Sequence, residues 1–216
     1  KMLSGLLYPS SGEVRVAGHV PAERRPEFLR AISLVMGQKR QLSWDLPAVD
    51  TFEFNRVVFD IDARDYRRRL DELVSLLAVG EVMRRPVRNL SLGERMKCEL
   101  VAALLHAPRI LFLDEPTIGM DVAMQLAIRE FVRRYNVEHG ATVILTSHYM
   151  EDVAALCPRI LVIDGGQLRF DGSIEALTRR IRPLRRTSVG ADLLPAKEQL
   201  AELGHVIEAG DGRLVL

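Results

Sequence analysis

The sequence has few of the features that mark secreted, membrane-spanning or nucleic-acid-binding chains. Its two cysteines, Cys98 and Cys157, are not at the spacing of a metal site, and they predict free thiols in a reducing compartment, the cytosol. Its longest apolar stretch, Leu100–Leu105, is far shorter than the ~20 residues of a membrane span. The 30 basic and 29 acidic side chains leave a net charge of +1, so no overall field attracts nucleic acid, and we expect no nucleic-acid partner.

The 216 residues, of which 48% are hydrophobic, are enough for one globular domain, with or without an appendage. Short apolar runs alternate with segments of helical periodicity, which predicts an α/β fold with a mostly parallel sheet. The expected strands are Glu13–Ala17, Ala31–Met36, Ile110–Leu113, Thr142–Leu145 and Ile160–Ile163, the last three buried on both faces. The clearest helical stripes are Leu70, Leu73, Val74 and Leu77, and Ile128, Phe131, Val132 and Tyr135.

A helical insert, a hairpin and a C-terminal appendage complete the expected organisation. Residues from about 40 to 106 form a helical insert, and Gln167–Phe170 completes a hairpin through Gly165 and Gly166. We expect a first domain over residues 1–178 and a short C-terminal appendage, with some β-structure, over 179–216.

Two adjacent carboxylates, Asp114 and Glu115, follow the apolar run Ile110–Leu113. The carboxyl end of a buried strand is where ligands bind in open α/β sheets, and an acidic residue there commonly holds Mg²⁺ on nucleotide phosphates. A neighbouring glutamate can orient or deprotonate a water molecule. The alternative is that the pair only opens a turn before Pro116.

Four other polar residues, at three sites, are ambiguous when each site is taken alone. Ser91 and Glu94 begin a helix and match a capping box, although the same helix N-terminus suits an anion. His148 follows the run Thr142–Leu145 and is either structural or part of the same sheet edge. Gln38, at the end of another predicted strand, carries almost no information by itself.

The order of these residues resembles that of ABC-type ATPases, and the resemblance covers about Lys1–Thr178. It rests on Gln38 (Q-loop), Leu90–Glu94 (signature), Ile110–Glu115 (Walker B), Gly119–Asp121 (D-loop) and His148 (H-loop). The implied fold is a RecA-like P-loop NTPase core with an ABC-type helical subdomain and a partial antiparallel β element. Gly37–Pro47 and Leu90–Lys97 resemble subunits that work with ABC-2-type permeases, mostly exporters.

The resemblance implies a role for each of these residues in a two-fold dimer that sandwiches ATP and Mg²⁺. Asp114 and Gln38 would contact the metal, and Gln38 would also take part in catalysis. Glu115 would be the general base, and His148 would steady the γ-phosphate. Ser91, Gly93 and Glu94 would face the ATP held by the partner chain, and Asp121 would bridge the dimer. Leu92 and Glu94 depart from the commonest signature, which has glycine and glutamine there.

The resemblance also implies a partner, an integral membrane permease that binds the helical subdomain at the cytoplasmic face of the cell membrane. Candidate contacts are Trp44, Phe52, Phe54 and Phe59, which could equally fill the helical core. The ATPase partner makes a homodimer or a heterodimer. The basic run Arg179, Arg180, Arg182, Arg185 and Arg186 is either a solvated helix face or a contact with anionic lipid.

The sequence contains no G-x-x-x-x-G-K-[ST] loop, the element that cradles phosphates in this family. Lys1–Leu7 looks like the end of the helix that would follow such a loop. We therefore expect a truncated chain that is inactive by itself and comes from an active ATP hydrolase. The alternatives are a soluble ABC ATPase of translation or DNA repair, and a non-catalytic regulatory module.

Overall fold

The computed structural model describes residues 1–37, 39 and 41–181, together with the strand segments 188–190, 208–210 and 213–215. The chain divides into two compact units, Lys1–Cys157 and Pro158–Leu216. This division falls after residue 157, and the domain boundary expected after residue 178 stays a prediction. No helix within the described residues combines the length and the apolar character needed to cross a membrane.

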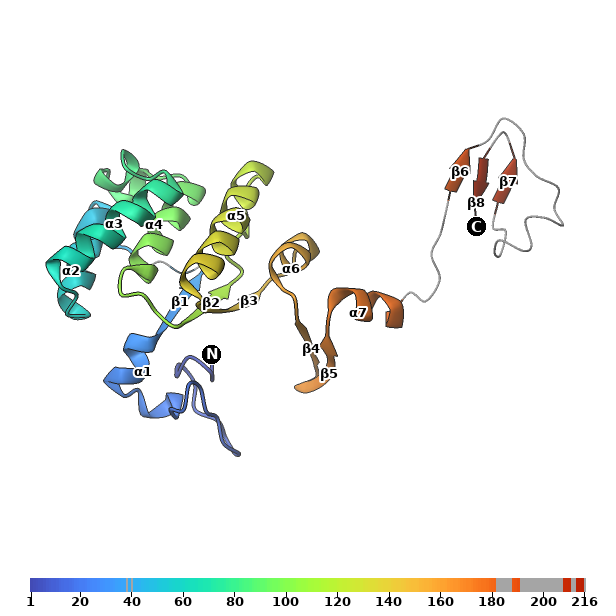
Figure 1. Ribbon diagram of the computed structural model, residues 1–216, viewed down its shortest axis with the longest axis horizontal. Coiled ribbons are helices and arrows are strands. Elements are labelled where there is room, and N and C mark those ends of the chain that lie inside the picture. The colour runs from blue at the N-terminus through green and yellow to red at the C-terminus, as the bar shows by residue number, and fades with distance from the viewer. Residues whose placement is uncertain (38, 40, 182–187, 191–207, 211–212, 216) are drawn as a thin grey trace. The chain divides into compact units, whose positions relative to one another are not determined.

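The first unit alternates helices with strands (Figure 1). Its elements are η1 (Pro21–Glu23), α1 (Pro26–Ala31), β1 (Ile32–Met36), α2 (Ala48–Val58), α3 (Ala63–Leu77), η2 (Val82–Arg84), η3 (Val87–Asn89), α4 (Leu92–Leu104), β2 (Ile110–Asp114), α5 (Val122–His139), β3 (Thr142–Thr146) and α6 (Met150–Leu156). The predicted alternation of helix and strand is confirmed.

A three-stranded parallel sheet in the order β1-β2-β3 forms the centre of this unit. The pairing register aligns Met36 with Asp114 and Asp114 with Thr146. All three strands therefore end at the same edge, as the sequence predicts for a parallel sheet. The residues that directly follow the three strands therefore lie close together at this edge.

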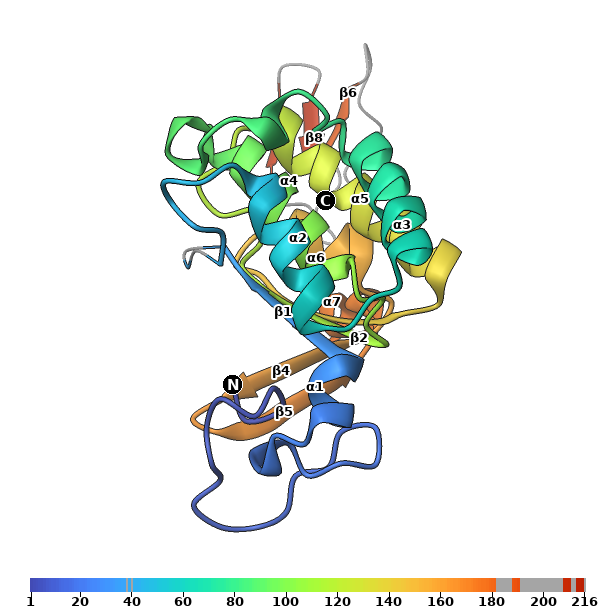
Figure 2. The ribbon, with the colours of Figure 1, turned by 90° about the vertical axis from the view of Figure 1, so that its left-hand side faces the viewer.

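The two faces of the sheet belong to different apolar clusters, because successive strand residues point to opposite sides. Val35, Leu111 and Leu113 join the large core formed with the helices, whereas Ile32 and Phe112 pack with Phe28 of α1. Figure 2 shows helices α2 to α5 gathered on one side of β1 and β2, and α1 at the start of β1. Burial of β2 on both faces is thus confirmed.

The same expectation is wrong for Thr142–Leu145, where exposed and half-buried residues alternate. The reason is position in the sheet: β3 pairs with β2 on one side and is an edge strand of the described sheet. An apolar run by itself does not tell a central strand from an edge strand.

The region from about 40 to 106 is helical, as predicted, and its helices begin and end at identifiable signals. Asp62 caps α3 by accepting hydrogen bonds from the backbone N–H groups of Arg64 and Asp65, and Ala78 ends the helix in the left-handed conformation. Phe52 of α2 and Leu100 of α4 are fully buried in the core that these helices share.

The N-terminal residues depart from two expectations. Lys1–Leu7 forms turns, in which Leu6 N–H donates to Lys1 C=O at 3.0 Å and Gly5 N–H to Met2 C=O at 3.1 Å. With Gly5 at φ 71°, these are the bonds that close an α-helix C-terminus, although no regular helix is present. Glu13–Ala17 is not a strand, because a tight turn leaves only a single bridge, between Val16 and His19.

The second unit contains the antiparallel hairpin of β4 (Ile160–Asp164) and β5 (Gln167–Gly172), which turns at Gly165 and Gly166 as predicted. Burial of β4 on both faces is wrong: Leu161 is 56% and Ile163 is 68% exposed, because β4 pairs with β5 alone among the described strands.

Helix α7 (Ile174–Ile181) and the strands β6 (Ser188–Gly190), β7 (Glu208–Gly210) and β8 (Arg213–Val215) complete the second unit. The three strands pair antiparallel in the order β6-β8-β7, so the described part of the predicted appendage contains β-structure. Arg179 and Arg180 lie in the last turn of α7. Arg182, Arg185 and Arg186 lie outside the described residues.

Two phenylalanines on α2 provide a matched test of this core. Phe52 is 0% and Phe54 is 65% exposed. Phe52→Ala should lower the free energy of unfolding by ~3–5 kcal/mol, because it leaves a cavity in the shared core. Phe54→Ala should change it by less than about 0.5 kcal/mol. Urea denaturation of both variants measures the difference, and equal losses would contradict the assigned packing.

Candidate functional site

Asp114 ends β2 at the sheet edge, where its carboxylate is held from the neighbouring strand. Its Oδ1 accepts a hydrogen bond of 2.6 Å from the Thr146 hydroxyl at the end of β3. Its backbone C=O accepts one of 2.8 Å from the N–H of Gly37, which follows β1. The ends of all three strands therefore meet at Asp114.

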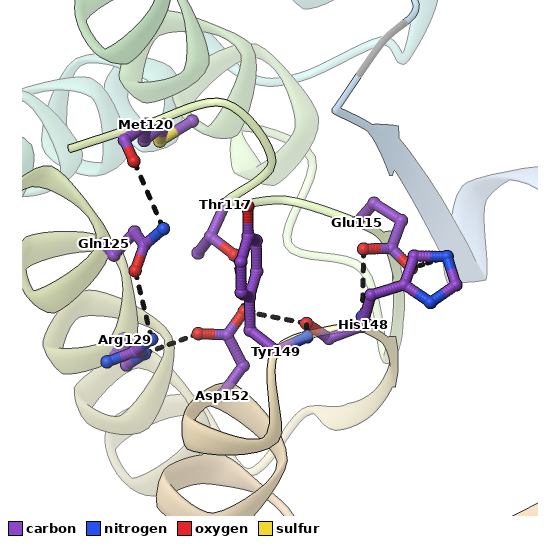
Figure 3. Close-up of polar contacts among 9 residues, drawn as sticks. Glu115, Thr117, Met120, Gln125, Arg129, His148, Tyr149 and Asp152 are labelled. Atoms are coloured by element: carbon purple, nitrogen blue, oxygen red, sulfur yellow. Dashed lines mark hydrogen bonds and ion pairs between the residues drawn. The ribbon is translucent and has the colours of Figure 1, made fainter. Parts of the chain in front are cut away.

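Glu115 and His148 lie side by side at the same edge (Figure 3). Glu115 Oε2 accepts a hydrogen bond of 3.2 Å from the His148 backbone N–H, and Oε1 lies 3.4 Å from His148 Nε2. The Glu115 side chain is 18% exposed, whereas that of His148 is 88% exposed. The glutamate is thus held in place while the imidazole remains open to a ligand.

The chain after β1 passes closely over Glu115. A Cβ on Gly37 would lie 2.1 Å from the Glu115 carbonyl oxygen, so only glycine fits at this position. Gln38, predicted to contact the metal ion and to take part in catalysis, lies outside the described residues, and its role stays a prediction.

The backbone of Glu115 adopts φ 53°, the left-handed region that a residue with a side chain rarely occupies. Such strain costs on the order of 1–3 kcal/mol and is concentrated at functional sites. The Glu115 N–H donates to Thr146 C=O at 3.0 Å, which extends the β2–β3 pairing by one residue into the turn.

Asp152 of α6, which no sequence pattern predicts as part of the site, has a completely buried side chain. It accepts hydrogen bonds from the hydroxyls of Thr117 and Ser147, and its Oδ1 lies 2.5 Å from Arg129 Nε. Thr117 follows Glu115 by two residues and Ser147 precedes His148. An acidic residue in the first turn of a helix gives no sequence signal for such a position, because most such residues face solvent.

Glu99 of α4 is a second buried acidic residue that the sequence does not predict. Its Oε1 accepts hydrogen bonds from the backbone N–H groups of Gln41, at 2.9 Å, and Leu42, at 3.3 Å. Burial raises the pKa of this carboxyl above its usual value. Glu99 thereby holds the segment after Gln38 against α4.

Ser91 and Glu94 form the capping box that the sequence predicts at the start of α4. Glu94 Oε2 accepts from Ser91 N–H at 2.8 Å, and Arg85 binds Oε1 at 2.6 Å. The Ser91 N–H first, and then the Arg85 guanidinium, hold the Glu94 pKa below its usual value. Both carboxylate oxygens are engaged, which favours a capping role for Glu94 over a direct contact with phosphate.

Gly93 and Asp121 both lie next to Met124 in the first turn of α5. A Cβ on Gly93 would lie 2.6 Å from two atoms of the Met124 side chain, so a larger residue would force that side chain to move. The Asp121 carboxylate caps α5 by accepting from Met124 N–H at 2.8 Å. Gly93 of the signature and Asp121 thus share Met124 as a neighbour, and Asp114, Glu115 and His148 are grouped at the sheet edge.

The oxygen atoms at the sheet edge and the start of α4 fit Mg²⁺ and ATP, the ligands that the resemblance implies. Mg²⁺ prefers oxygen ligands, and the Asp114 carboxylate and the Thr146 hydroxyl lie together there. The start of α4 presents backbone N–H groups and a small residue, Gly93, which suits a phosphate. The residues present are therefore compatible with a magnesium–nucleotide ligand.

Comparisons with known proteins support the resemblance on which these assignments rest. The family model described as ABC transporter matches residues 1–118. The chain is 29% identical over 177 residues to the ABC transporter ATP-binding protein NatA of Bacillus subtilis, covering 82% of this chain and 72% of NatA. It is 34% identical to the daunorubicin resistance ATP-binding protein DrrA3 of Streptomyces coeruleorubidus, covering 82% of this chain and 55% of that protein.

A third relative, the linearmycin resistance ATP-binding protein LnrL of Bacillus subtilis, is 33% identical and is covered over 57% of its length. The chain therefore spans little more than half the length of two of these relatives.

Among solved structures, the chain is similar to an ATP-binding subunit of an ABC transporter, with a TM-score of 0.72, 21% identity and coverage of 83% of this chain and 74% of the other. It is also similar to CbiO1 from Clostridium perfringens, with a TM-score of 0.69, 22% identity and coverage of 83% and 75%. These likenesses confirm the predicted fold class, that of ABC ATPase domains.

The capping box predicts a pH-dependent contribution to stability. Because the folded state lowers the Glu94 pKa, the unfolded state binds the proton more readily, and the contribution is lost as pH falls through the folded value. The stability advantage of wild type over Glu94→Gln should therefore shrink from about pH 7 to about pH 3. Urea denaturation across that range measures it. A difference that stays constant with pH would contradict the assigned ion pair.

Proposed function

Because this chain belongs to the ABC transporter family, a family of ATP hydrolases, we propose that it derives from the ATP-binding and ATP-hydrolysing subunit of an ABC transporter. The observation that carries the proposal is the sheet edge where Asp114, Glu115 and His148 meet. A carboxylate and an imidazole with different exposure, at the carboxyl ends of parallel strands, suit phosphoryl transfer to water.

In this proposal Glu115 is the general base. Its carboxylate is fixed by the His148 N–H and can orient and deprotonate a water molecule. The exposed His148 imidazole would donate a hydrogen bond to the γ-phosphate, and Asp114 would hold Mg²⁺, which neutralises charge on the phosphates when bound. Positioning accounts for most of the rate enhancement in such chemistry, which is why strand-end residues suffice.

A second part of the proposal is an ATP-dependent dimer, with either an identical or a different ATPase subunit. Ser91 and Gly93 begin α4, whose free N–H groups and positive dipole end favour a phosphate. Each chain would offer this end to the nucleotide held by its partner, and Asp121 would lie at the contact. ATP would stabilise the closed dimer and hydrolysis would open it, which gives the differential binding that coupling requires.

The third part concerns the membrane permease. Of the four aromatic candidates, Phe52 is buried and Phe59 stacks on His106 at 4.0 Å between ring centroids, so both serve the core. Trp44 and Phe54 remain exposed, at 39% and 65%. Three aliphatic residues close to them in the sequence are exposed as well, and we term the five residues the α2 patch: Trp44, Leu46, Phe54, Val57 and Val58. A permease helix from an ABC-2-type partner would cover this patch at the cytoplasmic face of the membrane.

Export is the proposed direction of transport. Two relatives, DrrA3 and LnrL, are named as resistance ATP-binding proteins, for daunorubicin and linearmycin respectively. Removal of a toxic compound from the cell is one way in which a transport ATPase confers resistance. The identity of the transported compound would be set by the permease.

Replacement of the proposed general base tests the ATPase function in the full-length protein. Glu115→Gln should lower kcat for ATP hydrolysis by about a hundredfold or more while ATP binding is retained, because only proton abstraction is removed. Phosphate release and nucleotide-binding fluorescence measure the two quantities. Glu138→Gln, the same change on the exposed end of α5, is the control. Retained hydrolysis in Glu115→Gln would remove Glu115 from this role, and an inactive wild-type protein would refute the proposal.

A charge placed in the α2 patch tests permease binding. Val57 is 66% exposed, so Val57→Asp should leave the fold unchanged and lower copurification of the proposed permease by about tenfold, because a charge would be buried on docking. Val137→Asp is the matched control, because Val137 of α5 is 74% exposed. Equal recovery of the permease with both variants would exclude this surface.

A further inference from the structure

Asp152 is a buried carboxylate that binds both turns carrying the proposed catalytic pair (Figure 3). Its Oδ2 accepts hydrogen bonds from the hydroxyls of Thr117 and Ser147, the latter at 2.9 Å. Its Oδ1 accepts from Arg129 Nε at 2.5 Å. One side chain of α6 therefore joins the turn after β2 to the turn after β3.

Each of the two hydroxyl partners is adjacent to a residue of the proposed active site. Ser147 directly precedes His148, and its Oγ also accepts a hydrogen bond of 3.0 Å from Tyr149 N–H. Both flanks of His148 are thereby fixed. Thr117, which is 1% exposed, lies two residues beyond Glu115 in the same turn.

The turn at Glu115 needs such an anchor. Its φ of 53° is unfavourable for a residue with a side chain, so the surrounding contacts must hold it there. Thr117 supplies one of these contacts through Asp152. If the anchor is lost, the turn can relax, and the Glu115 carboxylate moves relative to the water and to His148.

The charge of Asp152 is balanced by Arg129, whose side chain is 13% exposed. Arg129 Nη2 donates to Gln125 Oε1 at 3.3 Å, and Gln125 Nε2 donates to Met120 C=O at 3.2 Å. Met120 precedes Asp121. The network thus continues from Ser147, next to His148, to the loop that contains Asp121, the proposed dimer contact.

We propose that Asp152 is a positioning residue for ATP hydrolysis: through Thr117 and Ser147 it fixes the Glu115 carboxylate against His148. The inference rests on the proposed function, since it assigns to Asp152 the alignment of that proposed pair. Asp152 itself touches no reacting group, so its removal affects the catalytic step and leaves nucleotide binding largely intact.

A buried ion pair can also be purely structural, and matched variants separate the two roles. Thr117→Val removes the hydroxyl at constant volume, whereas Thr117→Ser keeps it. Ser147→Ala removes the second hydroxyl. Asp152→Asn keeps the shape and loses the charge that faces Arg129. The measurements are kcat and KM for ATP hydrolysis by the full-length protein, with nucleotide affinity and thermal stability of each variant.

We expect Thr117→Val, Ser147→Ala and Asp152→Asn each to lower kcat by about tenfold or more with less than about twofold change in nucleotide affinity, because small misplacements of reacting groups are costly. Thr117→Ser should stay within about twofold of wild type. Combining Ser147→Ala with Asp152→Asn should add little to Asp152→Asn alone, because both break the same unit.

The proposal is overturned if Thr117→Val and Ser147→Ala hydrolyse ATP at the wild-type rate, or if Thr117→Ser is as impaired as Thr117→Val. If Asp152→Asn fails to fold, the two hydroxyl variants decide. An inactive wild-type protein would refute the proposed function itself, whereas an active wild type with unimpaired variants refutes only the role of Asp152.

Discussion

The parallel register between β2 and β3 is the constraint on which the candidate site depends. It pairs Asp114 with Thr146, so Glu115 and His148, which lie one and two residues further on, are at the same edge of the sheet. In an antiparallel pair the two strand ends would lie at opposite edges, and no local adjustment would bring these side chains together. The helices on one face and α1 on the other stabilise this register by burying the side chains of β2 from both sides.

The site contains two unfavourable features, a strained backbone and a buried charge, which the surrounding hydrogen bonds compensate. Glu115 is strained, and Asp152 is a charge without access to water. A buried carboxylate is tolerated only when it is paired and hydrogen-bonded, and Arg129 with two hydroxyls supplies both conditions. The contacts that make Asp152 tolerable are also those that hold the turns on either side. Stability and alignment therefore depend on the same few atoms.

The start of α4 shows how far sequence reasoning reaches. Ser91 and Glu94 were predictable as a capping box, since the motif is local and its geometry follows from the helix itself. That Arg85 occupies the second carboxylate oxygen, and that Met124 packs on Gly93, was not predictable, because both partners come from other elements. The local motif thus fixes the helix start, and the surrounding residues determine which of its groups remain available to a ligand.

The sequence by itself determined the alternation of helices and strands, the helical subdomain, the hairpin at Gly165 and the group of Asp114, Glu115 and His148 at one sheet edge. These follow from periodicity, turn residues and the order of motifs, all of which are local or shared with a family. Only the tertiary structure decided that β3 lies at an edge of the described sheet, that Phe52 is buried while Phe54 is exposed, and that Asp152 and Glu99 are buried. Their burial depends on which elements pack against them, and the local sequence around a residue does not reveal its neighbours in the tertiary structure.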